Sequence, residues 1–332
     1  MEYVKLGNSG LDVSKICLGC MGFGDPEVWH HPWLINEEES RKVIQHALDV
    51  GINFFDTANV YSFGVSEQYL GRALKDFAKR EDIVIATKVS VTMREGKPNG
   101  TGLSRKEIFY ECEQSLKNLQ MEYIDLYIIH RWDYNTPIEE TMCALNDLVR
   151  SGKVRYIGAS AMHAWQFQKA QHVAEKNGWT KFISMQNHYN LIYREEEREM
   201  NPLCADTGVA STPYSPLAGG TLTRTAGEKS LRGETDKVQM KKYGAMVEED
   251  RIIIERVAEL AKKKGVLKSQ IALAWLWTKS PVVAPIVGAT KFSHIDDAVG
   301  ALAVQLSTEE ISYLEESYVP HPIVGLVDYP KK

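Results

Sequence analysis

The chain has 332 residues, of which 44% are hydrophobic and 25% are charged, and its formal net charge is −5. This composition is typical of a globular protein with a well-covered core and excludes a largely disordered chain. The negative balance, with no basic run longer than the three lysines at 262–264, argues against a nucleic-acid partner. No stretch approaches 18 consecutive apolar residues, and the first residues carry charges where a secretion signal needs an apolar run. We therefore expect a cytoplasmic protein that does not associate with membranes.

The first segment, residues 2–15, contains two short alternating runs around Asn8-Ser9-Gly10. This pattern predicts a β-hairpin, which could close the bottom of a barrel. The next segment, KICLGC, contains Cys17 and Cys20 in a C-x-x-C spacing that also occurs in zinc and redox pairs. Because residues three apart on a strand point to opposite faces, we expect two separately buried thiols instead. The five cysteines form no even framework of the kind that staples small secreted domains.

From about residue 40 onward, helical periodicity alternates with short apolar runs. With KICLGC as the first, the predicted strands span 15–20, 53–58, 82–88, 124–130, 154–160, 182–188, 208–215 and 284–289. The predicted helices span 39–51, 66–77, 104–119, 137–152, 164–178, 194–208, and 250–265 continuing to 272–279. The helix over 104–119, for example, aligns Ile108, Cys112, Leu116 and Leu119 in one buried stripe.

Eight continuous apolar strands that alternate with helices predict an α/β fold, a (β/α)8 TIM barrel. An open, doubly wound sheet is the alternative. Residues 220–249 form a long loop after the seventh strand, and loops of this length are usually functional or mobile. Because no linker or low-complexity tract interrupts the pattern, we expect one domain over residues 1–332.

Several proton-active side chains stand at or just after predicted strand ends. Asp56 ends the second strand, Lys88 the third and His130 the fourth, and Tyr61 follows Asp56 by five residues. In a barrel these ends converge on one mouth, where active sites are found. Taken singly, an Asp and a Lys often form a plain ion pair, and a lone His is often only a satisfied polar residue.

Together the four residues describe a proton donor. A phenol is too weak an acid for neutral pH, but the ammonium of Lys88 would lower the pKa of Tyr61, and Asp56 would hold Lys88 charged. His130 is placed to hydrogen-bond a substrate oxygen or to relay a proton. The pattern indicates general acid catalysis at a polarised carbonyl.

Reduction of a carbonyl also needs a hydride source. Gly19, Gly22 and Gly24 do not have the spacing of the usual dinucleotide fingerprint. Barrels commonly bind phosphate with the loops after strands seven and eight, and both loops fit here. The first is glycine-rich and carries Arg224, and the second places Gly288, Thr290 and Lys291 before a helix N-terminus. Tyr214 could stack on a flat ring beside them, although each loop alone is equally consistent with an ordinary capped turn.

In order along the chain, DTANVYSFGVSE, ATK, DLYIIHRWD, GKVRYIGAS, MQNHYN, YSPLAGG and PIVGA resemble the successive signatures of the aldo-keto reductase superfamily. The resemblance covers nearly the whole chain, and the combination is highly specific. Within the superfamily, HRWDYNTPIEETM and SMQNHYNLIYREEEREM are most similar to the bacterial YajO-like and fungal aryl-alcohol-dehydrogenase-like groups.

This resemblance implies a barrel enzyme in which Tyr61 is the proton donor, supported by Lys88, Asp56 and His130. It implies a nicotinamide stacked on Tyr214, with its carboxamide held by Ser160 and Gln186. It places the pyrophosphate against Ser215, Pro216, Leu217, Gly219 and the loop with Arg224. The 2′-phosphate side is implied to contact Gly288, Thr290, Lys291 and His294, and Asp297 the adenine or its ribose.

Two positions depart from the family pattern. Many members have Asn after the serine that corresponds to Ser160, whereas this chain has Ala161, so one carboxamide contact is missing. Many have Arg or Gln where His294 stands, which weakens the phosphate contact. Because Lys291 and Arg224 remain, we expect NADPH in preference to NADH, and no metal.

Loops around the mouth supply the candidate substrate contacts. These are Met21, Trp29, Trp33, Arg131 and Trp132. Three tryptophans and a methionine predict an apolar wall suited to aromatic or medium-sized aldehydes. Trp29 and the pair His30-His31 are equally consistent with exposed surface, and Arg131 could recognise a carboxylate or a phosphate.

The predicted function is NADPH-dependent reduction of aldehydes or ketones, with hydride from nicotinamide C4 and a proton from Tyr61. One alternative is a sugar-phosphate reductase or isomerase on the same barrel, in which the last two loops hold substrate phosphate. The other is a cofactor-binding regulatory subunit. The sequence leaves the physiological carbonyl, the favoured direction and the oligomeric state open.

Overall fold

The computed structural model describes residues 1–29, 31–224, 234–244 and 246–327. Its centre is an eight-stranded parallel sheet in the order β10-β3-β4-β5-β6-β7-β8-β9. The strands are β3 (Cys17–Gly19), β4 (Phe54–Asp56), β5 (Val84–Val89), β6 (Ile124–Ile129), β7 (Val154–Ser160), β8 (Ser184–Gln186), β9 (Ala210–Ser211) and β10 (Ile286–Gly288).

The sheet closes on itself. The backbone N–H of Val283 donates to the carbonyl of Ser211 (3.0 Å), and the N–H of Ile286 donates to that of Pro213 (2.9 Å). These bonds join the segments at the two ends of the strand order. The predicted (β/α)8 barrel is therefore confirmed, and the open doubly wound sheet is excluded.

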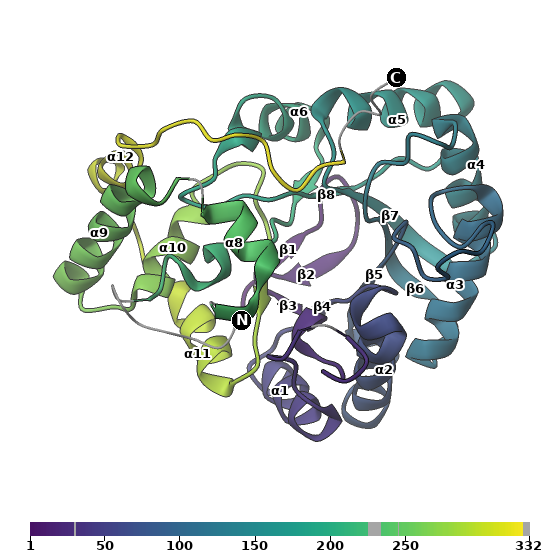
Figure 1. The fold of residues 1–332 in the computed structure, drawn as a ribbon, viewed down its shortest axis with the longest axis horizontal. Coiled ribbons are helices and arrows are strands. Elements are labelled where there is room, and N and C mark those ends of the chain that lie inside the picture. Colours follow the sequence, from purple (N-terminus) through teal and green to yellow (C-terminus); the bar gives the residue numbers. More distant parts are fainter. Residues whose placement is uncertain (30, 225–233, 245, 328–332) are drawn as a thin grey trace.

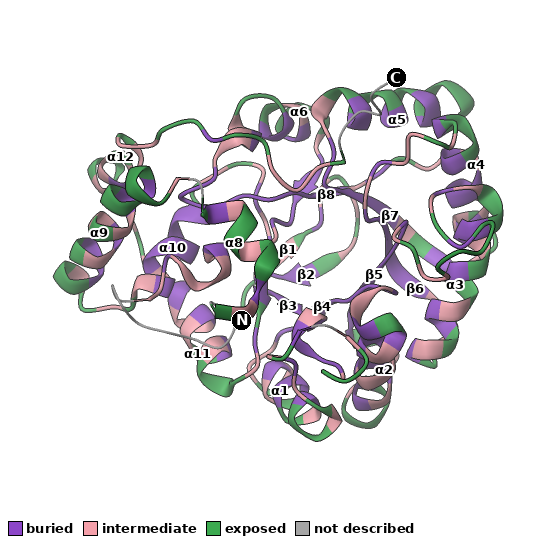
Figure 2. Ribbon diagram, in the orientation of Figure 1, coloured by how far each residue is buried: buried purple, intermediate pink, exposed green. Residues whose placement is uncertain are grey.

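Helices surround the strands (Figure 1). They are α1 (Glu37–Asp49), α2 (Val65–Phe77), α3 (Arg105–Leu119), α4 (Ile138–Arg150), α5 (Ala164–Asn177), α6 (Met200–Thr207), α8 (Lys237–Tyr243), α9 (Val247–Lys264), α10 (Lys268–Leu276), α11 (Phe292–Ala301) and α12 (Thr308–Glu315). Side-chain caps define several starts: Asn36 accepts from the N–H of Glu39 at α1, and Ser104 accepts from that of Glu107 at α3. The inward helix faces and the strands are buried, and the outward faces are exposed (Figure 2).

The core has two parts, one inside the barrel and one between the strands and the helices. The inner part includes Leu6 and Val13, which flank the turn of an antiparallel hairpin of β1 (Tyr3–Lys5) and β2 (Asp12–Ser14). This confirms the predicted N-terminal hairpin, and its apolar residues fill one end of the barrel. Cys17 belongs to the inner cluster and Cys20 to the outer one, so the two buried thiols are separate, as expected.

Several predicted boundaries are wrong, and most strands are shorter than predicted. The helix predicted over 272–279 is α10, which begins at Lys268 because the side chain of Gln270 caps its first turn by accepting from the N–H of Leu267 (3.0 Å). The helix over 194–208 is divided into a 3-10 turn, η4 (Glu195–Glu197), and α6, because Pro202 lacks an N–H and is tolerated only in the first turn of a helix. The strand over 208–215 is regular only at Ala210–Ser211, since Pro213 cannot donate to the ladder. The loop over 220–249 contains α8 and the start of α9, and its residues 225–233 and 245 lie outside the described residues.

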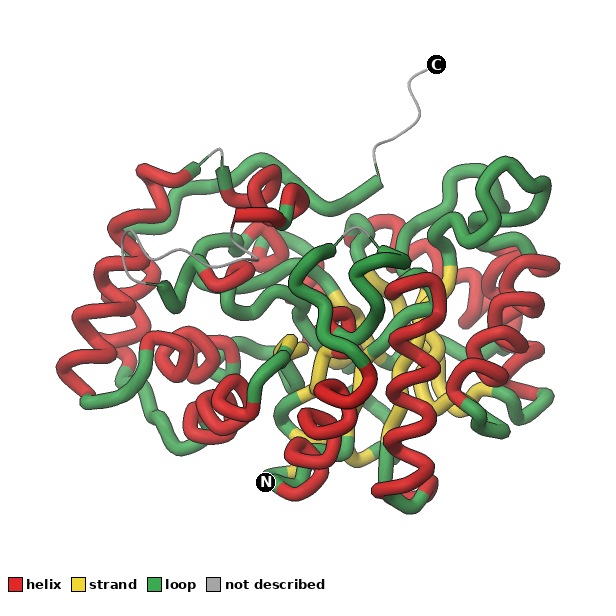
Figure 3. The backbone as a smooth tube through the Cα atoms, turned by 60° about the horizontal axis from the view of Figure 1, so that its bottom comes forward, coloured by secondary structure: helices red, strands yellow, loops and turns green. Residues whose placement is uncertain are grey.

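The two ends of the barrel differ. In Figure 3 the N-terminus lies at the lower edge, and long loops and the C-terminal segment gather at the upper end. β3 begins directly after the N-terminal hairpin, so the parallel strands run away from the lower end and their carboxyl ends lie at the upper end. It is therefore the end at which the side chains that follow each strand converge.

Candidate active site

Three polar side chains meet at the carboxyl ends of β4 and β5. The Nζ of Lys88 donates to Oδ1 of Asp56 (2.6 Å), to the carbonyl of Thr57 (2.7 Å) and to the hydroxyl of Tyr61 (3.2 Å). The Lys88 side chain is 0% exposed and that of Asp56 is 4% exposed. A buried ammonium thus has one carboxylate to balance its charge and one phenol within hydrogen-bond reach.

The electrostatics of Tyr61 differ from the sequence-based expectation. Burial raises the pKa of Tyr61 and outweighs the charge of Lys88, which lowers it, so the net direction is upward. The expected net lowering is wrong for this geometry, because desolvation of the phenolate is the larger effect. Tyr61 is consequently a neutral phenol at neutral pH and still holds the proton that a general acid must give.

His130 follows β6 and meets Tyr61 edge-on, with ring centroids 5.9 Å apart. Burial, together with the positive charges of Lys88 and Arg131, holds the pKa of His130 well below its usual value. Its buried Nδ1 has no hydrogen-bond partner among the described residues. A neutral imidazole beside the phenol can donate one N–H to a carbonyl oxygen.

The turn that carries Tyr61 has an unusual backbone. Ser62, Phe63 and Gly64 have φ angles of 49°, 51° and 91°, all in the left-handed region. Such runs cost energy in non-glycine residues and are common at functional sites. The turn packs against Gly24 of the loop after β3, where a Cβ would lie 2.6 Å from Cβ of Ser62. The loop after β3 therefore supports the position of Tyr61.

Ser160 and Gln186 stand at the ends of β7 and β8, next to this cluster. The Ser160 hydroxyl donates to the carbonyl of Gln186 (2.7 Å), and Nε2 of Gln186 donates to Oδ2 of Asp56 (2.9 Å). Both side chains are buried, and each keeps oxygen lone pairs that can accept from an amide N–H. This arrangement fits a carboxamide donor. The following residue, Ala161, has a φ of 48°, a conformation that Asn tolerates better than Ala.

Tyr214 lies in a cluster that the sequence did not reveal. His188 stacks on its ring with centroids 5.3 Å apart and planes at 11°, and Nζ of Lys242 in α8 lies 4.4 Å from the ring centroid. A Cβ on Gly325 would lie 2.8 Å from the Tyr214 hydroxyl. The C-terminal segment therefore passes directly beside Tyr214. Lys242 and Gly325 are 28 and 111 residues away along the chain, so no local pattern signals these contacts.

The predicted phosphate loops follow β9 and β10. Ser215, Ala218, Gly219 and Gly220 have positive φ angles of 54°, 50°, 63° and 94°. Backbones of this kind point successive N–H groups into a concavity that suits anions. Arg224 folds back over this turn, with Nε donating to the carbonyl of Gly220 (3.2 Å). Pro216 is buried and Leu217 is partly buried within the same turn.

The second loop leads into α11, whose N-cap residue Lys291 provides no side-chain cap. The N–H of Thr290 donates to Nδ1 of His294 (3.4 Å), which leaves Nε2 of a neutral His294 as a donor. Gly288 and Lys291 are exposed, and Asp297 lies one turn further along α11. A helix N-terminus with exposed N–H groups and a lysine fits a phosphate. The residues of both loops thus fit a phosphorylated dinucleotide.

The aromatic residues of the loop after β3 form a row that reaches Tyr61. Trp29 lies 6.0 Å from Tyr61, His31 lies 4.5 Å from Trp29, and Trp33 lies 4.8 Å from His31, all between ring centroids. His31 is only 5% exposed, so its interpretation as exposed surface is wrong: its ring is packed between the two indoles. His30 lies outside the described residues. Met21 is partly exposed in a 3-10 turn, η1 (Cys20–Gly22).

The two remaining candidates follow His130. Trp132 is buried and packs 6.1 Å from Trp165 of α5, between ring centroids. Arg131 is partly buried and lines a cavity of about 550 Å³ with Trp132.

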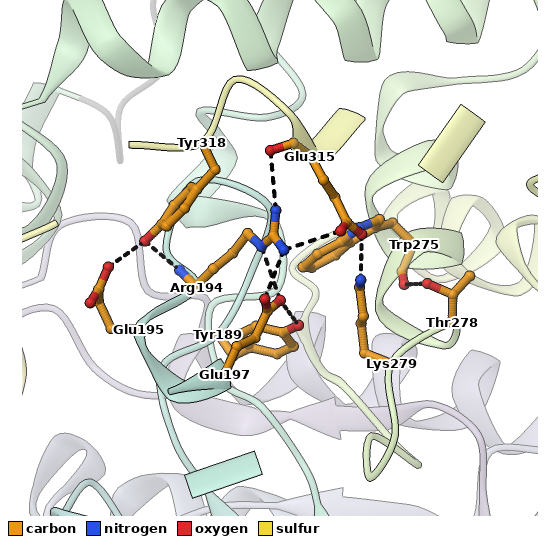
Figure 4. A network of polar contacts seen from close by, with 9 residues as sticks. All are labelled: Tyr189, Arg194, Glu195, Glu197, Trp275, Thr278, Lys279, Glu315 and Tyr318. Carbon is orange, nitrogen blue, oxygen red and sulfur yellow. Dashed lines mark hydrogen bonds and ion pairs between the residues drawn. The ribbon is translucent and has the colours of Figure 1, made fainter. Parts of the chain in front are cut away.

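The C-terminal segment is anchored beside the mouth by a polar network (Figure 4). Arg194 holds Glu197 through two hydrogen bonds (2.9 and 2.7 Å) and also contacts Glu315 at the end of α12 (3.1 Å). The hydroxyl of Tyr318 donates to Glu195 (2.8 Å). These bonds connect the loop after β8 with the chain end, and they fix where the segment towards Gly325 begins.

The chain matches the model of the Aldo/keto reductase family over residues 15–319. It belongs to this family. The aldo/keto reductase is 48% identical to the versiconal hemiacetal acetate reductase of Aspergillus parasiticus, over 97% of this chain and 98% of that protein. It is 47% identical to a putative aryl-alcohol dehydrogenase of Schizosaccharomyces pombe, over 97% of each chain.

A solved structure of a related enzyme has the same fold. The thermostable aldo-keto reductase Tm1743, in complex with the inhibitor epalrestat, superposes with a TM-score of 0.77 at 30% identity, over 96% of this chain and all of that one. The predicted resemblance to the aryl-alcohol-dehydrogenase-like group of the superfamily is confirmed by these relatives. The protein is an oxidoreductase of a family that acts on small carbonyl compounds with nicotinamide cofactors.

Every helix among the described residues is too short or too polar to span a membrane. No group of three or more His, Cys, Asp or Glu side chains in the same residues could hold a metal ion.

Proposed function

We propose that this aldo/keto reductase reduces aldehydes or ketones to alcohols with NADPH, and that Tyr61 donates the proton. The observation that carries the proposal is the position of Lys88, which contacts both Asp56 and the hydroxyl of Tyr61. NADPH would supply the hydride from C4 of its nicotinamide to the carbonyl carbon. The remaining chemistry belongs to the side chains of the mouth.

Tyr61 gives its proton to the carbonyl oxygen as negative charge develops there, and becomes a phenolate. The ammonium of Lys88, 3.2 Å away, stabilises this phenolate more than it stabilises the neutral phenol. Neutral His130 donates a hydrogen bond to the same carbonyl oxygen and orients it. Asp56 keeps Lys88 charged in its buried position.

Gln186 has a double role in this proposal. Its amide N–H₂ donates to Asp56, and the hydroxyl of Ser160 donates to its backbone carbonyl. Oε1 of Gln186 and the hydroxyl oxygen of Ser160 would accept from the carboxamide of the cofactor. The turn at Ser215–Gly220 with Arg224 would hold the pyrophosphate. Thr290, Lys291 and His294 would hold the 2′-phosphate, which would favour NADPH over NADH, and Tyr214 would contact the nicotinamide.

The direct experiment is an activity screen with NADPH and NADH against aromatic aldehydes, aliphatic aldehydes and aldose phosphates. We expect oxidation of NADPH by at least one carbonyl class, with NADH used more weakly. Failure of every carbonyl, together with tight NADPH binding and a stable partner in pull-downs, would support a regulatory subunit instead.

A competition experiment tests which molecule occupies the phosphate loops. We expect a 2′-phosphorylated adenosine nucleotide to displace NADPH in a fluorescence titration. Displacement by sugar phosphates alone would assign the loops to substrate phosphate and would contradict the proposed cofactor site.

A further inference from the structure

Arg131 is a partly buried arginine whose charge is not balanced by a side chain. In the described residues its guanidinium donates from Nη1 to the backbone carbonyl of His130 (3.1 Å) and also contacts the hydroxyl of Tyr214, a neutral group. No carboxylate among those residues lies within ion-pair distance of it. A guanidinium has five N–H groups, so most of its hydrogen-bonding capacity remains available.

The other deeply placed arginines behave differently. Arg80 pairs with Asp125 (2.6 Å), Arg194 pairs with Glu197 (2.7 Å), and Arg256 pairs with Glu316 (2.8 Å). This is the usual rule, because withdrawing a cation from water is costly unless an anion accompanies it. Arg131 departs from the rule at the mouth of the barrel, where a ligand could supply the missing anion.

The guanidinium lies close to the reacting groups. It directly follows His130, and its charge is near enough to lower the pKa values of both Tyr61 and Tyr214, although burial raises each of them more. Tyr61 and Tyr214 mark the proposed positions of the carbonyl oxygen and the nicotinamide. A substrate whose carbonyl oxygen lies at Tyr61 would therefore place the end away from its carbonyl near Arg131.

A cavity beside Arg131 can accommodate the end of the substrate away from its carbonyl. Arg131 lines a cavity of about 550 Å³ between the loop after β5, the loop after β6 and Val327 of the C-terminal segment. Hydroxyl and amide side chains such as Thr92, Asn99 and Asn135 make up much of the wall. The size is appropriate for a medium-sized organic molecule, and the wall can hydrogen-bond a polar one.

The single carboxylate in the wall has its own partners. Asp133 accepts from the N–H of Leu103 (2.8 Å), from the hydroxyl of Thr136 (2.7 Å) and from the N–H of Asn135 (2.8 Å). It therefore holds the two loops together and does not neutralise Arg131. Its negative charge disfavours a doubly charged ligand in the same cavity more than a singly charged one.

We propose that Arg131 binds a carboxylate on the carbonyl substrate, so that the enzyme prefers carboxylated aldehydes or ketones to neutral ones of the same size. The planar fork of the guanidinium matches a carboxylate through two parallel hydrogen bonds. This inference rests on the proposed carbonyl reduction and names the substrate class for the same site.

The test compares two aldehydes of nearly equal size, 4-carboxybenzaldehyde and 4-formylbenzamide, with NADPH. For the wild-type enzyme we expect kcat/KM to favour the carboxylate by roughly 10- to 100-fold, the range for a charge-assisted pair. In Arg131→Gln the ratio should fall to about one. Arg131→Lys keeps the positive charge but lacks the planar guanidinium, so it should retain part of the preference for the carboxylate. It also provides the test if the glutamine variant does not fold.

Arg150→Gln is the matched control, because it removes the same charge at the exposed end of α4, outside the cavity lining. Its ratio should equal that of the wild type. A binding measurement with ligands that can be neither reduced nor oxidised by the cofactor removes the dependence on turnover: calorimetry on the NADP+-saturated protein should show tighter binding of 4-methylbenzoate than of 4-methylbenzamide, and Arg131→Gln should abolish the difference.

The outcomes separate the inference from the proposed function. If both aldehydes are reduced equally well and the Arg131 variants leave the ratio unchanged, the carboxylate site is refuted while carbonyl reduction stands. If no carbonyl is reduced, the proposed function fails as well. A clear preference for glyceraldehyde 3-phosphate that is lost in Arg131→Gln would overturn the carboxylate in favour of a phosphate.

Discussion

The Nζ of Lys88 lies 3.2 Å from the hydroxyl oxygen of Tyr61. The ammonium is fully buried, and its charge is balanced by Asp56 on the neighbouring strand. Burial raises the pKa of Tyr61 and keeps the phenol protonated, and in the proposed mechanism the same ammonium stabilises the phenolate that remains after proton transfer. Lys88 thus contributes both to the free energy of unfolding and to the proposed proton transfer. Mutations of Lys88 and Asp56 can separate these two contributions.

Lys88→Met should abolish turnover and also destabilise the fold. It leaves the buried carboxylate of Asp56 without its cation, and breaking a buried pair typically costs about 3–5 kcal/mol. Adding Asp56→Asn should restore much of the free energy of unfolding without restoring turnover. Urea denaturation of the single and double variants measures the first effect, and an NADPH assay measures the second. Unchanged stability in Lys88→Met would show that the ion pair is not formed.

Ala161→Asn should strengthen NADPH binding. Ala161 has a left-handed backbone at the end of β7, which Asn tolerates, and an Asn amide can add the carboxamide contact that the family pattern includes. One hydrogen bond corresponds to about 0.5–1.5 kcal/mol, or roughly 2- to 13-fold in Kd. The control is Ala161→Gly, which relieves the backbone without adding an amide. Equal NADPH affinity of the Asn and Gly variants in a fluorescence titration would contradict the contact.

Gly24→Ala should reduce turnover although Gly24 makes no catalytic contact. An added Cβ would lie 2.6 Å from Cβ of Ser62, so the turn that carries Tyr61 must shift. A displacement of about 1 Å at a reacting group can lower the rate by about 100-fold. Adding Ser62→Gly removes the clash, and its φ of 49° suits glycine, so activity should largely return. Absence of this rescue would show that the two loops are not coupled in this way.

The contribution of His321 to stability should depend on pH. Its Nδ1 lies 2.7 Å from the carbonyl of Val319 and its Nε2 lies 3.0 Å from Oδ1 of Asp250, so both nitrogens face acceptors, an arrangement that favours the imidazolium over the neutral ring. Burial lowers the pKa of His321, but these partners outweigh it and the net direction is upward. A raised folded-state pKa means that the stabilisation is complete below the unfolded value of about 6.5 and is lost as pH rises through the folded value.

The measurement compares the free energy of unfolding of the wild type with that of His321→Gln at about pH 6 and about pH 9. The difference should be about 1.5–3 kcal/mol at the lower pH and smaller at the higher one. A difference that grows with pH would mean that His321 is neutral in the folded protein.

The barrel could be predicted from the sequence because each unit carries its own signal. The strands are short and apolar, the helices have one apolar stripe, and the strand ends mark the mouth. The catalytic candidates Asp56, Lys88 and His130 follow from that rule alone. The short β9 was not predicted, because the effect of Pro213 on the ladder depends on which strand lies next to it.

The features that were missed depend on long-range packing. Contacts of Lys242 and Gly325 with Tyr214 join segments far apart in the chain. The anchoring of the C-terminal segment by Arg194 and Glu315 has the same origin (Figure 4). The direction of the Tyr61 pKa was missed because burial, unlike a neighbouring charge, cannot be read from spacing.

The central claim is that Tyr61 supplies the proton, and Tyr61→Phe tests it most directly. This variant removes one oxygen and should leave the NADPH site intact. We expect kcat to fall by about 100- to 10,000-fold for an aldehyde that the wild type reduces, while the Kd for NADPH stays within about twofold. Turnover close to that of the wild type, with NADPH bound normally, would contradict the account.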